Sequence, residues 1–117
     1  MTIETTLMST LLAKCPRVYV GAAPFGTAQP YVTWQHIGGD PLAYLDNTVA
    51  TTRNAQIQIN TWAATPLQAF TLIQQIEQAL RAEMAFLATP QFEPIGAYAE
   101  VDDISGYLQT YSITGAR

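Results

Sequence analysis

Apolar side chains recur every three or four residues through much of the second half of the chain. This spacing predicts an amphipathic helix over Pro66–Leu87, about six turns long at 3.6 residues per turn. Thr65 can cap the helix, Pro66 suits its first turn, and Thr89-Pro90 ends it. The apolar stripe, which must be buried against another layer, is Leu67, Phe70, Ile73, Ile76, Leu80, Met84 and Leu87.

The segment before this helix, Arg53–Ala63, alternates between two kinds of side chain. Alternation with period 2 predicts a β-strand, because successive side chains of a strand point to opposite faces. One face carries Ala55, Ile57, Ile59 and Thr61, and the other carries Gln56, Gln58, Asn60 and Trp62. An apolar face opposite a polar face is typical of a sheet that is covered on one side.

Further elements flank this pair. Apolar spacing predicts a first helix within Thr2–Cys15, with Thr2 as its cap and Pro16 as its stop. Strands are predicted at Arg17–Val20, Tyr31–Ile37, Ile95–Val101 and Tyr107–Ile113. The order predicts an α+β fold: a mainly antiparallel sheet of about four to five strands, with two amphipathic helices packed on one face. We expect residues 1–117 to form one domain.

Composition excludes several classes of protein. Charged residues make up 12% of the chain, about half the roughly 25% of an ordinary soluble domain. Five basic and nine acidic residues give a net charge of −4, which argues against a phosphate-binding surface. One cysteine and one histidine exclude an intrachain disulfide and metal sites built from several such residues. Without a long apolar run or a basic leader, we expect a soluble, non-secreted protein with no membrane contact.

The scarcity of charge is greatest in the middle of the chain. Between Arg17 and Glu77 the sequence contains three charged residues, Asp40, Asp46 and Arg53. A monomer usually covers its surface with charge, whereas the cores of interfaces are depleted of it. Two interpretations therefore stay open: a monomer with an uncharged polar surface, and a subunit that buries much of its surface in an assembly.

Two segments have no regular period. Gly21–Pro30 contains two glycines and two prolines, but it lacks the motif of a phosphate-binding loop. Pro41–Thr52 contains the turn signal Asp46-Asn47. An irregular segment of this length in a small domain is often functional, so we expect either a mobile loop or a hairpin arm that reaches a neighbour.

Candidate catalytic groups are few. His36 could pair with Asp40, Asp46 or Asp102, but no nucleophile motif accompanies it. We interpret His36 as a structural residue on the strand face that carries Trp34.

Other chemically notable residues also have simpler interpretations. We interpret Cys15 as a small core residue and Asp102-Asp103 as a solvated turn. The aromatic residues Trp34, Trp62, Tyr31 and Tyr107 are assigned to core or interface packing, because no basic groove accompanies them. We therefore predict no catalytic residue, no cofactor and no metal ligand.

The assembled pattern resembles a bacteriophage tail-completion family that is related to the tail terminators of long, non-contractile-tailed phages and prophages. The resemblance begins with the strand–loop–strand from Val18 to Gln35 and covers nearly the whole chain. It continues through Asp46, Arg53, Gln56–Ile59, Ala63–Thr65, Ala79-Leu80 and the acidic turn Asp102–Tyr107. The chain departs from the family at Ser112–Gly115, where members often have an aromatic-rich closing strand.

The resemblance implies a structural protein of the virion tail, assembled in the host cytoplasm, with no enzymatic activity and no cofactor. Such subunits form a ring, typically of six copies, that caps the head-proximal end of the tail tube. The implied partners are other copies of the chain, the tail-tube protein and the head-completion or connector protein. DNA would pass through the ring without specific binding, which suits the acidic balance of the chain.

Alternatives remain at this stage. One is a tail-tube or head–tail adaptor subunit of related fold, another is a small enzyme that uses His36, and a third is a monomer that assembles only on the tail tip. The candidate contact regions are Pro24–Pro30 and Pro41–Thr52, because these segments are long, contain glycine and proline, and carry few charges. The candidate interface residues are Pro24, Phe25, Gln29, Pro41, Leu42, Tyr44, Leu45, Asp46 and Arg53.

Overall fold

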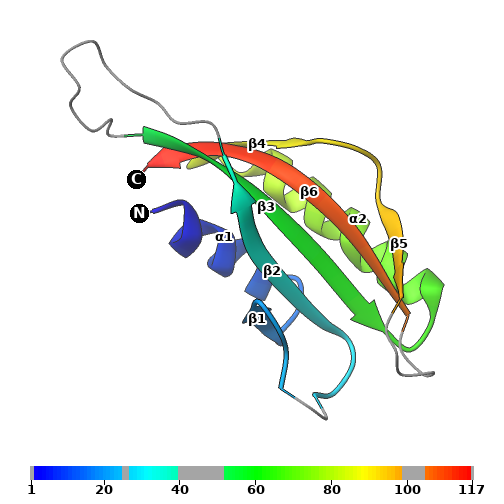
Figure 1. Ribbon diagram of the computed structural model, residues 1–117. Coiled ribbons are helices and arrows are strands. Elements are labelled where there is room, and N and C mark those ends of the chain that lie inside the picture. The colour runs from blue at the N-terminus through cyan, green and yellow to red at the C-terminus, as the bar shows by residue number, and fades with distance from the viewer. Residues whose placement is uncertain (1, 25–26, 40–51, 99–104, 117) are drawn as a thin grey trace, which may run out of the picture.

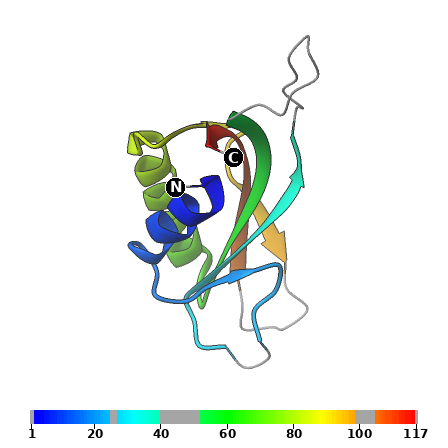
Figure 2. The same ribbon diagram turned by 90° about the vertical axis from the view of Figure 1, so that its left-hand side faces the viewer.

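The computed structural model describes residues 2–24, 27–39, 52–98 and 105–116. Two helices, α1 (Ile3–Leu12) and α2 (Pro66–Ala82), pack on one face of a curved sheet (Figures 1 and 2). The strands in chain order are β1 (Val18–Val20), β2 (Tyr31–Gly38), β3 (Thr52–Ala63), β4 (Phe86–Pro90), β5 (Ile95–Tyr98) and β6 (Ser105–Ala116). The predicted α+β class, with both helices on one side, is confirmed.

The six strands form one mixed sheet in the order β1-β2-β3-β6-β4, and β5 also pairs with β6. β1 runs parallel to β2, and every other described pair is antiparallel. The longest pairing joins β3 to β6 over their whole length, from Thr52 opposite Ala116 to Ala63 opposite Ser105. β4 and β5 both lie on the far side of β6, so the sheet has β1 at one edge and β4 with β5 at the other.

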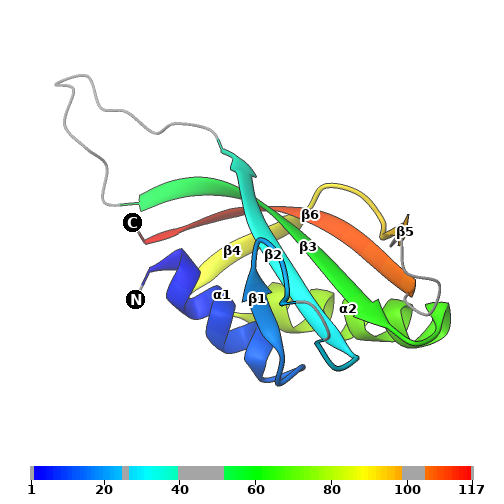
Figure 3. The same ribbon diagram turned by 60° about the horizontal axis from the view of Figure 1, so that its bottom comes forward.

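The alternation predicted for β3 is confirmed. Ala55, Ile57, Ile59 and Thr61 are buried beneath the helices, whereas the residues between them are half-buried on the opposite face. The α2 helix lies across β3 and β6 and contributes the other side of the core (Figure 3). A hydrogen bond from the hydroxyl of Thr61 to the carbonyl oxygen of Ala69, at 2.9 Å, fixes the helix to the strand.

The beginning of α2 is confirmed and its end is not. The hydroxyl of Thr65 accepts a hydrogen bond from the backbone N–H of Gln68 at 3.2 Å, and Pro66 is the first helical residue. The predicted helix over Pro66–Leu87 stops at Ala82, where Glu83 adopts an extended backbone. The carboxylate of Glu83 then accepts two backbone hydrogen bonds, from Met84 and Ala85, each at 3.1 Å.

The residues after this turn form β4, and its first two residues, Phe86 and Leu87, had been predicted to be helical. β4 pairs with β6, and its side chains alternate, with Phe86 and Ala88 buried and Leu87 70% exposed. Met84, predicted to lie on the buried stripe, is 97% exposed, and Leu67 at the other end of the stripe is exposed as well. The apolar spacing continues past Ala82, but the chain there is not helical. It joins the sheet instead, because β6 offers an edge with which Phe86–Pro90 can pair.

The core is closed by a polar network as well as by apolar contacts. The hydroxyl of the fully buried Tyr111 donates to Gln109 Oε1 at 2.7 Å. Gln109 Nε2 in turn donates to Glu77 Oε1 at 2.8 Å and to the carbonyl oxygen of Phe92 at 2.9 Å. β6 therefore connects the middle of the sheet to α2 and to the segment between β4 and β5.

Candidate assembly interface

The sheet face opposite the helices is here called the open face (Figure 2). In the described strands it carries no charged side chain. Arg53 is the charged residue of β3, and its side chain lies on the helix side, where it meets Glu4. Depletion of charge is typical of an interface core. The open face consists of Tyr31, Thr33, Gln35, Asn54, Gln56, Gln58, Asn60, Trp62, Leu87, Thr89, Leu108, Thr110, Ser112 and Thr114.

The side chains of the open face are ordered by contacts with one another. Tyr31 stacks on Trp62 with ring centroids 6.4 Å apart, and Trp62 Nε1 donates to the hydroxyl of Thr33 at 3.3 Å. Gly106 lies beneath the Trp62 ring, where a Cβ atom would come within 2.5 Å of Cε3. Gln58 Nε2 donates to Asn60 Oδ1 at 3.0 Å. A partner would thus meet a surface that has already lost much of its side-chain freedom, which reduces the entropy cost of binding.

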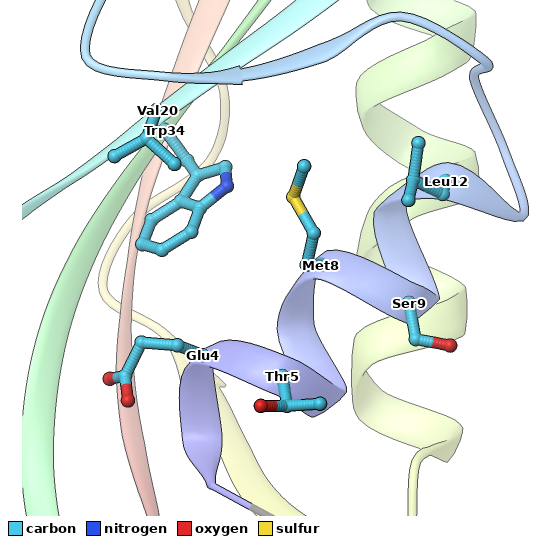
Figure 4. Close-up of a pocket in the computed structure, with 7 residues that line it drawn as sticks. All are labelled: Glu4, Thr5, Met8, Ser9, Leu12, Val20 and Trp34. Atoms are coloured by element: carbon cyan, nitrogen blue, oxygen red, sulfur yellow. The ribbon is translucent and has the colours of Figure 1, made fainter.

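A second feature is a groove between α1 and the edge formed by β1 and β2 (Figure 4). Its volume is about 680 Å³, within the range of binding pockets. Two apolar residues in its wall are unusually exposed, Val20 at 61% and Leu12 at 45%. The groove is lined by Glu4, Thr5, Met8, Ser9, Leu12, Val20 and Trp34.

Trp34 forms the back of the groove. It is 4% exposed, yet among the described residues nothing accepts a hydrogen bond from its indole Nε1. In Figure 4 the nitrogen edge of the ring faces the side of the groove where Met8 and Leu12 project from α1. A buried N–H group without an acceptor costs about 1–3 kcal/mol, so an acceptor supplied from outside would stabilise this site.

Ionic contacts form one rim of the groove. Glu4 Oε2 lies 3.0 Å from His36 Nε2 and also accepts a hydrogen bond from Arg53. Partial burial raises the pKa of Glu4, but the hydrogen bonds from Arg53 and His36 outweigh that effect, and the net pKa lies below the usual 4.5. The contacts join α1 to the ends of β2 and β3 and hold one wall of the groove in place.

The sequence matches the model of a family described as tail completion protein gp17 over residues 5–114. The match spans α1, α2 and all six strands almost completely. The chain belongs to this family. The resemblance stated from the sequence is thereby confirmed, and the protein is a structural component of a bacteriophage tail that contacts other tail or head proteins. A comparison with curated proteins gives no match.

Three of the nine interface candidates in this tail completion protein lie within the described residues. Pro24 is exposed, and its carbonyl oxygen accepts hydrogen bonds from the Thr27 backbone at 3.2 Å and the Thr27 hydroxyl at 2.5 Å. The carbonyl oxygen of Gln29 accepts a hydrogen bond from Arg17 Nη2 at 3.2 Å. Arg53 lies at the groove rim. The candidates outside the described residues are Phe25, Pro41, Leu42, Tyr44, Leu45 and Asp46, and an interface role for all nine stays a prediction.

The chemically notable residues of the tail completion protein are placed as follows. The possible His36 partners Asp40, Asp46 and Asp102, and the predicted turn Asp102-Asp103, lie outside the described residues. The structure instead gives His36 a partner in Glu4.

Cys15 is buried, as predicted, with its thiol 3.5 Å from the carbonyl oxygens of Arg17 and Pro30. The described part of the chain contains no group of three His, Cys, Asp or Glu side chains that could hold a metal ion. It also contains no helix with the length and apolar character needed to cross a bilayer.

The groove was not predicted from the sequence. A signal for it exists in the first helix, whose apolar residues Ile3, Leu7, Met8, Leu11 and Leu12 cover more of the helix than one buried stripe requires. In the structure Ile3, Leu7 and Leu11 are buried, whereas Met8 and Leu12 line the groove. Excess apolar width on a surface helix can therefore indicate a contact with another molecule.

Proposed function

We propose that this tail completion protein forms a closed ring of its own copies that caps the head-proximal end of the tail tube. The ring would end polymerisation of the tube protein and offer a docking surface to the connector of the head. The family match over residues 5–114 is the observation that carries this proposal. Assembly would take place in the host cytoplasm before the ring becomes part of the virion.

The open face supports an assembly role. A six-stranded sheet with one uncharged face, rich in amide and hydroxyl groups, has the composition of a contact surface. The net charge of −4 also suits a ring through which DNA slides, because a lining rich in lysine and arginine would hold phosphates. No catalytic step is proposed, since the role is architectural.

The edges of the sheet support this role over that of a tube subunit. β1 has three residues, and β4 has five and ends in a proline. Short edge strands and proline at an edge limit strand-by-strand polymerisation. The geometry thus favours one closed layer over a long cylinder built by continuing the sheet.

The test is electron microscopy of tube protein that polymerises with and without this protein. We expect tubes with one extra layer at one end and a narrow length distribution when the protein is present, and open, overlong tubes when it is absent. Virions assembled without the protein should leave heads and tails unjoined. Growth of the purified chain alone into long cylinders, or normal head–tail joining in its absence, would overturn the proposal.

A matched pair of variants examines the open face in the same assay. Gln56→Glu places a charge on the half-buried middle of the open face, whereas Gln75→Glu places the same charge on the exposed side of α2. We expect Gln56→Glu to reduce the fraction of capped tubes at least several-fold and Gln75→Glu to leave it unchanged. Equal capping by both variants would remove the open face from the interface.

A further inference from the structure

The groove between α1 and β1–β2 exposes groups that another molecule could cover. Val20 and Leu12 expose apolar surface in its wall, and the buried Nε1 of Trp34 points into it with no acceptor among the described residues. Apolar surface and an unpartnered donor require the same complement, which is a segment with apolar side chains and a backbone or side-chain oxygen. A peptide segment of a protein supplies both.

The chain itself contains a segment of this chemistry. Residues 40–51, which lie outside the described residues, join β2 to β3, and they include Leu42, Tyr44, Leu45 and Val49. Twelve residues tethered at both ends reach about 20 Å from their tethers, taking about 3.3 Å per residue out and back. This length is sufficient to reach a neighbouring subunit.

The symmetry of a ring favours a neighbour over the same molecule. β2 passes the groove at Trp34 and continues through His36 to Gly39, about 16 Å onward at about 3.3 Å per residue, while β3 begins at Thr52, next to Arg53 at the groove rim. Both tethers therefore lie at the Glu4–Arg53 end of the groove, from which the segment can extend towards another subunit. A contact from this end of one subunit to the groove of the next uses two different surfaces, as a ring of identical subunits requires.

Charge at the rim is compatible with this occupant. Arg53 carries several N–H donors, of which Glu4 engages part, and its side chain remains 24% exposed. The segment carries two carboxylates, Asp40 and Asp46. An incoming carboxylate can therefore bind Arg53 while apolar side chains occupy the groove.

We infer that the groove lined by Trp34, Val20 and Leu12 binds residues 41–49 of a second copy of this chain. Apolar side chains of the segment fill the space between α1 and β1, and one of its oxygen atoms accepts the hydrogen bond from Trp34 Nε1. The inference rests on the proposed ring and specifies how adjacent subunits of that ring are joined.

The direct test is disulfide cross-linking between two differently tagged copies. Cys15→Ala removes the native thiol from both copies; one copy then carries Val20→Cys and the other Leu45→Cys. The control replaces Val20→Cys by Ile95→Cys, a 51% exposed position on β5 at the opposite edge of the sheet. Oxidation is carried out on the concentrated protein and on capped tail tubes.

We expect a mixed dimer for the Val20 and Leu45 pair, at least ten-fold more abundant than for the Ile95 control. An internal disulfide in one chain that carries both Val20→Cys and Leu45→Cys, without the mixed dimer, would show that the segment folds onto its own subunit and overturn the inference. A cross-link from Val20→Cys to tube protein would also overturn it. If the mixed dimer is absent both in solution and on capped tubes, the inference is overturned as well.

A second assay separates this inference from the proposed function. Val20→Lys, or deletion of Leu42–Thr51, should lower the fraction of capped tubes at least ten-fold, while Ile95→Lys should leave it unchanged. Thermal melting confirms that each variant is folded. If the groove variants cap tubes normally, the inference is wrong and the proposed function stands; if the wild-type protein does not cap tubes, the proposed function is wrong.

Discussion

The two helices of this tail completion protein cover their parts of the sheet to different degrees. Under α2, the buried Tyr111 hydroxyl donates to Gln109, which is itself held by Glu77 and Phe92. Beside α1, Trp34, which is also buried, has an indole N–H with no acceptor in the described part of the chain. Both are large aromatic residues with one polar group, and within the described residues that group has a partner in one half but not in the other.

The difference separates the part of the molecule that supports the fold from the part available for assembly. The α2 half gains its stability within the subunit, because its apolar and polar groups both find partners. The α1 half leaves a groove with exposed valine and leucine side chains and a tryptophan N–H without an acceptor among the described residues. A neighbouring molecule could cover the side chains and accept that hydrogen bond. In the proposed ring, a neighbouring subunit would supply the contacts that the described residues of the α1 half lack.

The largest expected contrast comes from truncating an aliphatic side chain in each half. Ile76→Ala, in the fully buried core under α2, should lower the free energy of unfolding by about 2–5 kcal/mol, because it removes buried methyl groups and leaves a cavity. Val20→Ala in the groove should change it by less than about 0.5 kcal/mol. Urea unfolding of the free subunit measures both, and equal losses would contradict the comparison.

A smaller loss is expected from the polar network under α2. Tyr111→Phe keeps the ring but leaves the buried Gln109 Oε1 without its donor, so the free energy of unfolding should fall by about 1–3 kcal/mol. Burial, reinforced by the nearby Glu77 carboxylate, raises the pKa of Tyr111, and the hydroxyl therefore remains a donor at neutral and mildly alkaline pH. If urea unfolding shows no loss for Tyr111→Phe, the polar network does not stabilise the α2 half, and the contrast with the α1 half does not hold.

Local patterns predicted the elements whose signals lie within a few residues. The cap at Thr65, the proline at Pro66 and the alternation of β3 all depend on neighbours in the chain, and all were confirmed. The boundary at Ala82 was not predictable in this way. The chain leaves the helix because β6, formed by residues 105–116, offers a free edge to Phe86–Pro90, and no local repeat contains that information.

In the candidate interface, too, some features follow from local sequence and others depend on residues far apart in the chain. The uncharged composition gave a contact surface as one of two interpretations, but the groove depends on Glu4, Trp34 and Arg53, which are distant in the sequence. Glu4 lies in the first turn of α1, and Arg53 begins the strand predicted over Arg53–Ala63. Their pairing across 49 positions is a tertiary contact that spacing along the chain does not encode.

The helix caps give a third, more moderate comparison. Thr2 and Thr65 accept equivalent hydrogen bonds, each at 3.2 Å, from the backbone N–H three residues later. Thr65→Ala and Thr2→Ala should each cost about 0.5–2 kcal/mol of helix stability. If the α1 half is the less cooperative one, hydrogen exchange in Thr2→Ala should accelerate in α1 alone, whereas Thr65→Ala should lower protection across the sheet. Uniform acceleration in both variants would argue that the halves unfold together.

The smallest expected effect is a pH dependence at the groove rim. The pKa of Glu4 is lower in the folded state than its usual 4.5, so between these two values the unfolded chain binds more protons than the folded one. The contribution of Glu4 to stability is therefore present above pH 4.5 and is lost as the pH falls through its folded pKa. For a partly exposed pair the contribution is about 0.2–1 kcal/mol.

Urea unfolding of wild-type protein and Glu4→Gln from pH 3 to pH 7 measures this contribution. The difference in unfolding free energy between the two proteins should be constant above pH 5 and shrink towards pH 3, and Arg53→Gln should largely remove that pH dependence. A difference that grows towards low pH would mean that burial, which raises the pKa of Glu4, dominates over its hydrogen bonds. In that case the rim would be held by packing of α1 rather than by charge, and the groove would keep its shape when Glu4 is neutral.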